Sequence, residues 1–252
     1  METVFLTGGA GLLGRQFVAA FLERGNRVIY TSHSTDKIQA MERTYPSQVQ
    51  DGQLVSFPLD LLAEDMERQV MSFLVQHDLH PAYLVNNARS LAFVKIEDYR
   101  KITEEQWLGE FRLDVVVPYK LMMLLSGMKP SALKSVANIS SMYGLLAYNE
   151  YLCEGAPSIS SNYGVAKAAL IQLTREMAAR LAGKGIRVNC ISYGGVAGRA
   201  DEAFQKRYAN LCPARKMLAP EDVAAPLLHL CSPQSSGMTG QNLVVDGGFS
   251  IW

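Results

Sequence analysis

The chain has 252 residues, 48% of them hydrophobic, which is enough to bury a large core, and its 24 basic residues balance its 24 acidic residues. This neutral balance, without a run of like charge, argues against a nucleic-acid or anionic-membrane surface and favours a small-molecule partner. The start of the chain has no leader pattern, and no apolar stretch reaches the ~18 residues of a membrane span, so we expect a cytoplasmic protein.

Short runs rich in β-branched and aromatic residues alternate along the chain with helix-period segments. The runs are residues 3–8, 27–32, 54–60, 82–88, 135–141, 186–192 and 242–248. The helical segments are residues 12–24, 63–77, 103–126, 160–182 and 220–231. This pattern predicts an α/β fold with a doubly wound, seven-stranded parallel sheet flanked by helices. No linker interrupts it, so we expect residues 1–252 to form a single domain.

The loop "TGGAGLLG", residues 7–14, lies between the first run and the first helical segment. Gly8, Gly11 and Gly14 would permit a tight turn, a close approach of the backbone to a pyrophosphate, and close packing of the helix. The N-terminus of that helix would face the phosphates. Because this is where a doubly wound fold binds a dinucleotide, we expect the loop to hold one.

The ends of the second and third runs bear on which dinucleotide binds. An acidic residue at the end of the second strand would bind the ribose of NAD and repel the 2′-phosphate of NADP. Here Ser32, His33 and Ser34 offer donors instead, so NADP(H) is favoured over NAD(H), although His33 could equally face solvent. Asp60 is placed for the adenine amino group, although an Asp at a strand end also commonly caps a helix.

The four cysteines are scattered without C-x-x-C spacing, which favours reduced thiols over a disulfide framework or a zinc site. They are Cys153, Cys190, Cys212 and Cys231. We expect no metal site in this chain.

The helical segment 160–182 opens with Tyr163 and Lys167, four residues apart. Residues at this spacing lie on one face of a helix, so the phenol and the ammonium group can point into one cleft. This spacing is common by chance, and its meaning depends on the other motifs of the chain.

Six motifs occur together and in order along the chain. They are the glycine loop, "NNA" at residues 86–88, "SS" at 140–141, "YGVAK" at 163–167, "IRVNCIS" at 186–192 and "TGQNLVVDGG" at 239–248. Together they resemble the short-chain dehydrogenase/reductase family in its single-domain form, over nearly the whole chain. The resemblance implies an enzyme that transfers hydride to or from a nicotinamide.

The resemblance assigns roles to three residues. Tyr163 would be the general acid/base, although a free phenol, with a pKa near 10, ionises too weakly to work well near neutrality. The positive charge of Lys167, together with the oxidised nicotinamide, would favour the phenolate, and this Lys also binds the nicotinamide ribose in the family. Ser141 would polarise the substrate oxygen, with Ser140 as the alternative if the register is off by one.

The same resemblance extends the expected cofactor contacts beyond the glycines and the serines. These further contacts are Leu12, Leu13, Leu61, Asn87, Ala88, Tyr163, Lys167, Gly194 and Val196.

Asp114 departs from the family pattern, which has Asn at this position, counted from Trp107. That Asn normally holds a water of a proton relay to the Lys, and Asp could still accept from such a water. Its charge would stabilise Lys167 as ammonium while weakening the field that favours phenolate. Alternatively, Asp114 points away and caps a helix kink or pairs with Arg112 or Lys120.

Three further departures lie near the expected substrate. Arg89 replaces the usual Gly and could fold over the cofactor, meet an anionic substrate or point into solvent. Tyr193 stands where Pro is usual, and Gly198 where a Thr normally contacts the carboxamide. Both changes indicate an altered substrate lip, although Tyr193 could be only a wall residue.

Residues 142–162 form an insertion between Ser141 and Tyr163 that is longer than the family commonly uses, and we expect it beside the substrate. Its polar side chains suit a polyhydroxylated substrate better than a lipid, and Tyr148 is a candidate substrate contact. These side chains are Tyr143, Tyr148, Asn149, Glu150, Tyr151 and Glu154. With the tail "DGGFSIW", the insertion is similar to oxidoreductases found with bacterial surface-sugar, nonulosonic-acid and flagellin-glycan biosynthesis.

Three functions remain open from the sequence. The leading one is an NADP(H)-dependent carbonyl reductase or alcohol dehydrogenase acting on a sugar-like substrate. The second is a promiscuous reductase of apolar ketones or acyl carriers. The third is a cofactor-binding protein with weakened catalysis, against which the joint presence of Ser141, Tyr163 and Lys167 argues. The resemblance also implies a homo-oligomer, a dimer or tetramer, formed through the helices containing residues 103–126 and 160–182.

Overall fold

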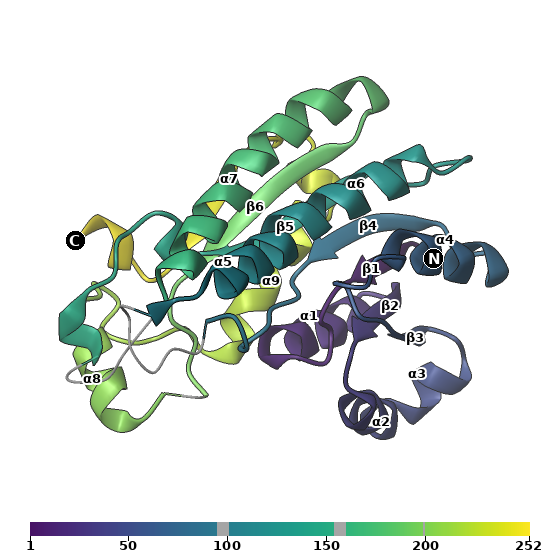
Figure 1. The fold of residues 1–252 in the computed structure, drawn as a ribbon. Helices are drawn as coiled ribbons and strands as arrows, with labels where there is room; N and C mark the ends of the chain where they lie inside the picture. The colour runs from purple at the N-terminus through teal and green to yellow at the C-terminus, as the bar shows by residue number, and fades with distance from the viewer. Residues whose placement is uncertain (95–100, 154–159, 199) are drawn as a thin grey trace.

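The computed structural model describes residues 1–94, 101–153, 160–198 and 200–252. Seven strands form one sheet in the order β3-β2-β1-β4-β5-β6-β7, and every neighbouring pair is parallel (Figure 1). They are β1 (Thr3–Leu6), β2 (Arg27–Ser32), β3 (Leu54–Pro58), β4 (Pro81–Asn86), β5 (Ser135–Ser141), β6 (Arg187–Tyr193) and β7 (Asn242–Val245). The predicted doubly wound, seven-stranded sheet is confirmed.

The helices that connect the strands match the predicted segments and add three. The α-helices are α1 (Leu12–Glu23), α2 (Thr35–Thr44), α3 (Pro46–Gln50), α4 (Met66–Gln76), α5 (Glu104–Phe111), α6 (Val117–Gly127), α7 (Ser161–Leu181), α8 (Glu202–Asn210) and α9 (Ala224–Leu230). A π-helical turn, η2 (Arg112–Val116), joins α5 to α6. The 3₁₀ turns are η3 (Met142–Gly144), η4 (Glu150–Cys153), η5 (Ala182–Lys184), η6 (Pro220–Val223), η7 (Pro233–Ser235) and η8 (Phe249–Ile251).

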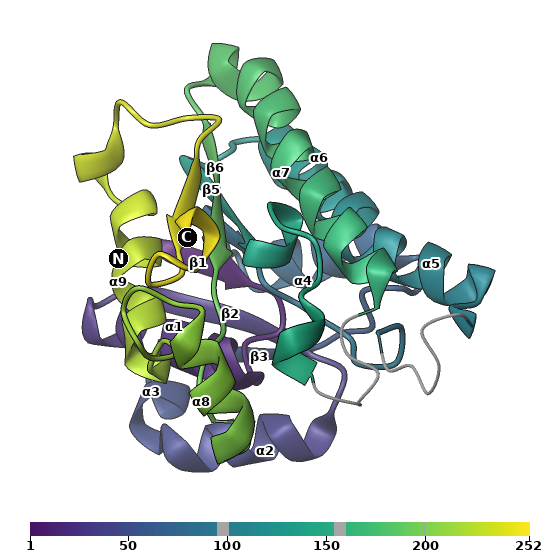
Figure 2. The same cartoon turned by 90° about the vertical axis from the view of Figure 1, so that its left-hand side faces the viewer.

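Two hydrophobic cores lie on opposite faces of the sheet because successive strand residues point to opposite sides. In β1, Val4 and Leu6 pack with α1 and α9. Phe5, between them, packs on the other face with α4, α6 and α7. Figure 2 shows the sheet between these two groups of helices.

The order of the strands reverses between β1 and β4, so the loops that leave these two strands diverge and open a crevice at the carboxyl edge of the sheet. The glycine loop follows β1 and the "NNA" motif ends β4, which places both at this crevice.

Two properties of the described residues bear on the earlier expectations. Among them, no helix has both the length and the apolar character that a membrane span needs. Cys190, Cys212 and Cys231 are buried free thiols.

Candidate active site

A cleft of about 1250 Å³ lies at the carboxyl edge of the sheet. Its walls come from the loops after the first six strands and from the beginning of α7. The expected cofactor contacts line it, with the exception of Ser34. They are Gly8, Gly11, Leu12, Leu13, Gly14, Ser32, His33, Asp60, Leu61, Asn87, Ala88, Tyr163, Lys167, Gly194 and Val196.

The glycine loop is packed so tightly that three of its positions exclude a side chain, and a Cβ on Gly9 would lie 2.5 Å from the Cβ of Tyr30. Gly8 has a φ of +68°, and a Cβ there would lie 2.8 Å from the Cα of Ala88. A Cβ on Gly14 would lie 2.3 Å from the carbonyl oxygen of Gly8. The loop therefore brings bare backbone to the cleft, directly before the N-terminus of α1.

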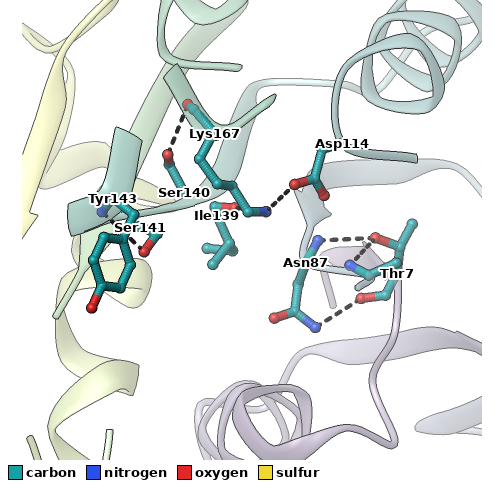
Figure 3. A network of polar contacts seen from close by, with 9 residues as sticks. Thr7, Asn87, Asp114, Ile139, Ser140, Ser141, Tyr143 and Lys167 are labelled. Carbon is teal, nitrogen blue, oxygen red and sulfur yellow. Dashed lines mark hydrogen bonds and ion pairs between the residues drawn. The ribbon is translucent and has the colours of Figure 1, made fainter. Parts of the chain in front are cut away.

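The loops after β1 and β4 are joined by four hydrogen bonds, and Figure 3 shows those between Thr7 and Asn87. The Thr7 hydroxyl accepts from the backbone nitrogens of Asn87 at 2.9 Å and Ala88 at 3.0 Å. In return, the Asn87 amide donates to the carbonyls of Thr7 at 3.0 Å and Gly8 at 3.1 Å. The amide nitrogen of Asn87 thus holds the glycine loop in place.

The side chains after β2 differ from the sequence-based expectation in one respect. Ser32 and His33 line the cleft, but the Ser34 hydroxyl caps α2 by accepting from the backbone nitrogen of Lys37 at 3.4 Å. Lys37 itself lines the cleft beside them. Sequence reasoning missed this cation because it did not predict α2, a short polar helix that begins directly after the strand.

Asp60 lines the cleft after β3, and it does not cap a helix, because α4 begins only at Met66 with Asp65 as its N-cap. Its carboxylate accepts from the backbone nitrogen of Leu62 at 2.9 Å.

The two serines that end β5 have different partners. The Ser140 hydroxyl donates to the carbonyl of Lys167 at 3.0 Å and so fastens the strand to α7. The Ser141 hydroxyl accepts from the backbone nitrogen of Tyr143 at 3.2 Å (Figure 3). The geometry favours Ser141 over Ser140 as the serine available to a substrate, because the Ser140 proton is already bonded to α7.

Tyr163 and Lys167 lie together in the first turns of α7, 8% and 5% exposed, and both line the cleft. The Lys167 ammonium donates to the carbonyl of Ile139 at 3.1 Å and lies 5.6 Å from the centre of the Tyr163 ring. Burial by itself lowers the pKa of Lys167. The surrounding negative charges, above all that of Asp114, outweigh burial, so the pKa of Lys167 is raised above its ordinary value.

Asp114 is 2% exposed and lies in the π-helical turn η2, where its carboxylate pairs with the Lys167 ammonium at 2.9 Å (Figure 3). The alternative partner Lys120 instead pairs with Glu67 at 2.8 Å. Asp114 therefore points toward Lys167, and the alternative in which it points away is wrong.

A small cavity of about 10 Å³ lies next to this ion pair, and it has room for about one water molecule. Its polar lining residues are Thr7, Asn86, Asp114 and Lys167.

Arg89 is exposed, and its guanidinium lies 4.6 Å above the centre of the Tyr163 ring. This is cation–π geometry, in which the positive charge is attracted to the face of the ring. Arg89 therefore stands at the same end of the cleft as Tyr163 instead of extending away from it.

Of the remaining candidates near the substrate, Tyr193 lines the cleft, whereas Tyr148 and Gly198 are not among its lining residues. Tyr193 is 3% exposed, and its hydroxyl donates to the carbonyl of Val223 at 2.5 Å, so it is a wall residue whose polar group is already used. Tyr148 is 39% exposed and is not among the described residues that line the cleft. Gly198 has a φ of +116°, a conformation that a threonine rarely adopts, so its backbone explains the glycine.

The substrate end of the cleft also contains residues that the sequence did not single out. The apolar ones are Leu91, Phe93, Met142, Phe204 and Met217, and the polar ones include Ser90 and Asp201. Several follow β4 or belong to α8, a short helix that is polar on average, so no apolar run marked them.

The described part of the insertion packs against α8 instead of lying free. The Arg207 guanidinium of α8 donates to the carbonyl of Leu152 in η4 at 3.0 Å. Glu154, named as a candidate substrate partner, lies outside the described residues.

Comparisons with known proteins place the chain among oxidoreductases. A family model described as "Enoyl-(Acyl carrier protein) reductase" matches residues 9–250. A 3-oxoacyl-[acyl-carrier-protein] reductase FabG of Chlamydia trachomatis is 28% identical over 99% of this chain and 97% of its own length. A galactitol 2-dehydrogenase (L-tagatose-forming) of Cereibacter sphaeroides is 34% identical over 47% of this chain and 46% of its own length.

Among solved structures, a short chain dehydrogenase from Leptospira borgpetersenii with bound NAD+ is similar to this chain with a TM-score of 0.86. It is 25% identical, and the match covers 99% of this chain and 93% of that one.

Proposed function

The chain belongs to the short-chain dehydrogenase/reductase family, and from this premise we propose that it transfers hydride between NADP(H) and a polar, sugar-like alcohol or ketone. The observation that carries the proposal is the meeting of Ser141, Tyr163 and Lys167 in one cleft with the glycine loop. A decayed site would have no reason to keep all three.

The bound nicotinamide would supply or accept the hydride, and the chain's own residues would handle the proton. In oxidation, the Tyr163 phenolate takes the proton of the substrate hydroxyl, while the Lys167 ammonium favours the phenolate electrostatically. In reduction, the Tyr163 hydroxyl donates the proton to the substrate oxygen. Ser141 donates a hydrogen bond to that oxygen and stabilises the charge that develops on it.

Asp114 would take the place of the usual Asn in the proton relay. Its carboxylate lies at 2.9 Å from the Lys167 ammonium, beside a cavity with room for one water. A carboxylate can accept from such a water as an amide oxygen does. Its charge also keeps Lys167 in the ammonium form, so the relay depends on the charges of both Asp114 and Lys167.

The preference for NADP(H) rests on the residues after β2. Ser32 stands where an acidic residue would repel a 2′-phosphate, and Lys37 adds a cation on the same side of the cleft. A phosphate bound there would receive a hydroxyl donor and an ammonium group, a charge-assisted pairing that NAD cannot match.

A polar substrate is supported by the groups around Tyr163. Ser141, Tyr143 and Asp201 offer hydroxyl and carboxylate partners, and Arg89 offers a cation beside the reacting position. These groups suit an oxygen-rich substrate, including one with an anionic group. The resemblance to a galactitol dehydrogenase over part of the chain points the same way.

The apolar side chains of the cleft favour a second candidate, a reductase of apolar ketones or acyl carriers. Phe93, Phe204 and Met217 line the cleft and could bind an acyl chain. The match to a 3-oxoacyl-[acyl-carrier-protein] reductase over nearly the whole chain supports this alternative. We favour the polar substrate because a bound acyl group would displace water from the charged groups of Arg89 and Asp201 without offering them a polar partner.

The proposal includes a homo-oligomer, a dimer or tetramer, that acts in the cytoplasm. The outward surfaces of α5, η2, α6 and α7 carry exposed apolar side chains that a second copy would cover. These are Leu108, Phe111, Val116, Tyr119, Met123 and Val165.

A substrate screen tests the proposal. Consumption of NADPH would be followed with keto-sugars, with 3-oxoacyl thioesters and with small apolar ketones, and the same panel would be run with NADH. We expect the keto-sugars to turn over fastest with NADPH. Faster turnover of the thioesters would establish the second candidate, and no turnover with any ketone or alcohol would contradict both.

A further inference from the structure

Glu110 is a buried acid that the proposed reaction does not use. It lies in the last turn of α5, one turn before Asp114, and it is 0% exposed. An ionised carboxylate at such a position carries a large desolvation cost unless a cation or several donors compensate it. The surroundings of Glu110 therefore decide its charge.

No N–H or O–H donor reaches either carboxyl oxygen of Glu110 from the described parts of the chain. One turn further along the helix lies the buried carboxyl group of Asp114, which acts electrostatically on Glu110. Two ionised carboxylates have acceptors only and repel each other, so a bond between them requires that one of them holds a proton. The pair thus carries one proton whenever such a bond forms.

The charge balance of the cluster leads to the same result. Lys167 supplies one positive charge, and its ammonium is already bonded to Asp114 at 2.9 Å and to the carbonyl of Ile139 at 3.1 Å. With Asp114 ionised, the cluster is neutral. An ionised Glu110 would leave an uncompensated negative charge inside the protein, which is the more costly state.

We propose that Glu110 and Asp114 share a single proton beneath Lys167, and that Glu110 is thereby a positioning residue that sets the charge under the Lys167–Tyr163 pair. While Glu110 holds the proton, it donates to Asp114 and leaves the Asp114 carboxylate to Lys167. Once Glu110 loses the proton, two negative charges face the ammonium from the α5–η2 side.

Groups on three elements act on Glu110. Burial and the Asp114 charge raise its pKa, while Lys167 from α7 and Arg89 from the loop after β4 lower it, and the pKa of Glu110 is raised to about 7 as a result. The proton of the pair is therefore lost near neutral pH, within the range in which an enzyme works.

The consequence for catalysis rests on the proposed function. A second negative charge near Lys167 opposes formation of the Tyr163 phenolate, the form that oxidation requires. Loss of the Glu110 proton should therefore make the phenolate form only at higher pH, so that the oxidation rate also rises only at higher pH. Removing that charge should let oxidation begin at lower pH.

The first experiment needs no substrate, so its outcome is independent of the proposed function. Infrared difference spectra across pH 5–9 would record the band of a protonated carboxylic acid in the parent protein, in E110Q, in D114N and in E105Q. Glu105 lies on the same helix but is exposed, which makes E105Q the matched control. We expect a band that disappears near neutral pH in the parent and in E105Q and that is missing in E110Q.

In D114N the same band should persist but disappear at lower pH, because the like charge that raises the pKa of Glu110 is gone. A parent protein without such a band, or a band unchanged in E110Q, would overturn the proposal.

The second experiment measures the oxidation rate against pH with the substrate found by the screen. We expect E110Q to shift the rising limb to lower pH by up to about one unit, a size typical of one neighbouring charge, and E105Q to leave it in place. An unmoved limb in E110Q would overturn the positioning role. Should no substrate be found, the infrared result still decides whether the pair shares a proton, while the proposed function fails separately.

Discussion

At the scale of single residues, Lys167 is where two electrostatic requirements of the site compete. Its ammonium must stabilise the Tyr163 phenolate, yet the buried Asp114 carboxylate at 2.9 Å already neutralises part of its charge. Arg89 lies 4.6 Å from the centre of the Tyr163 ring and supplies a second cation. We infer that the Arg89 charge stabilises the Tyr163 phenolate and thereby compensates in part for the destabilising charge of Asp114.

Tyr163 should be required for chemistry and not for binding the cofactor. Removing its hydroxyl in Tyr163→Phe should lower turnover by about 10² to 10⁴, the usual contribution of a positioned general acid, with the cofactor Kd within a few-fold. Steady-state rates and a fluorescence titration of the nicotinamide would measure the two effects. Tyr45→Phe, at a tyrosine that follows α2 and is not among the residues lining the cleft, is the matched control. Near-parental turnover in Tyr163→Phe would refute the assigned chemistry.

The residues after β2 should set cofactor preference. Lys37→Ala should weaken NADPH by roughly 10- to 100-fold, the range of one charge-assisted hydrogen bond, and leave NADH nearly unchanged. Ser32→Asp should weaken NADPH as well, because like charges repel. Binding of both cofactors would be titrated, with Arg43→Ala, an exposed cation on the same helix, as the control. Equal loss of NADH and NADPH in Lys37→Ala would contradict contact with a 2′-phosphate.

At the scale of elements, the strands and long helices followed from periodicity, whereas the short polar helices did not. Strand residues such as Val4, Phe5 and Leu6 are buried on both faces, so their apolar run was visible in the sequence. Both α2 and α8 are short and polar on average, so too few apolar residues marked them in the sequence. Lys37 and Phe204 were missed for this reason.

The π-helical turn η2 also left no mark in the sequence, because its extra residue changes hydrogen bonding without changing composition. The position of Asp114 followed from counting along a known motif, and its contact with Lys167 was open until the fold was known. Glu110 was not anticipated, since a Glu at that spacing reads as an exposed helix residue until the packing of α5 buries it.

A single added methyl group should disrupt the loop that joins β1 to α1. Gly14→Ala would place a Cβ 2.3 Å from the Gly8 carbonyl oxygen, so the loop must shift away from the position in which it receives a pyrophosphate. We expect cofactor affinity to fall at least about tenfold, together with a lower Tm. Gly127→Ala at the end of α6, where a Cβ meets nothing within 4 Å, is the control. Parental affinity in Gly14→Ala would show that the loop does not hold the cofactor.

At the scale of the whole molecule, the exposed apolar side chains of α5 and α7 should be covered in an assembly. Leu108→Lys places a charge at a residue that is 63% exposed, and burying that charge against a second copy is unfavourable. Light scattering after size-exclusion chromatography should show a dimer or tetramer for the parent and a smaller species for Leu108→Lys. Val75→Lys, at a residue of α4 that is 68% exposed, should leave the mass unchanged. A monomeric parent would refute the oligomer.

The stability of the whole molecule should also depend on pH through Glu110. Its pKa in the folded protein, about 7, is above the value of 4.5 for an unburied Glu, so folding favours the protonated form. This contribution is fully present below pH 4.5, declines as the pH rises, and is lost above about pH 7. Relative to Glu110→Gln, the parent should therefore lose on the order of 1–3 kcal/mol of unfolding free energy across that interval.

Urea unfolding of the two proteins at intervals from pH 4.5 to 8 would measure this difference. Because Gln does not titrate, any fixed effect of the substitution on packing is the same at every pH, and only the change in the difference carries the test. Glu105→Gln should follow the parent throughout, because Glu105 is exposed. If the difference in unfolding free energy between the parent and Glu110→Gln is the same at every pH, Glu110 titrates as a solvated acid. The inference that Glu110 is neutral beside Asp114 and Lys167 would then be wrong.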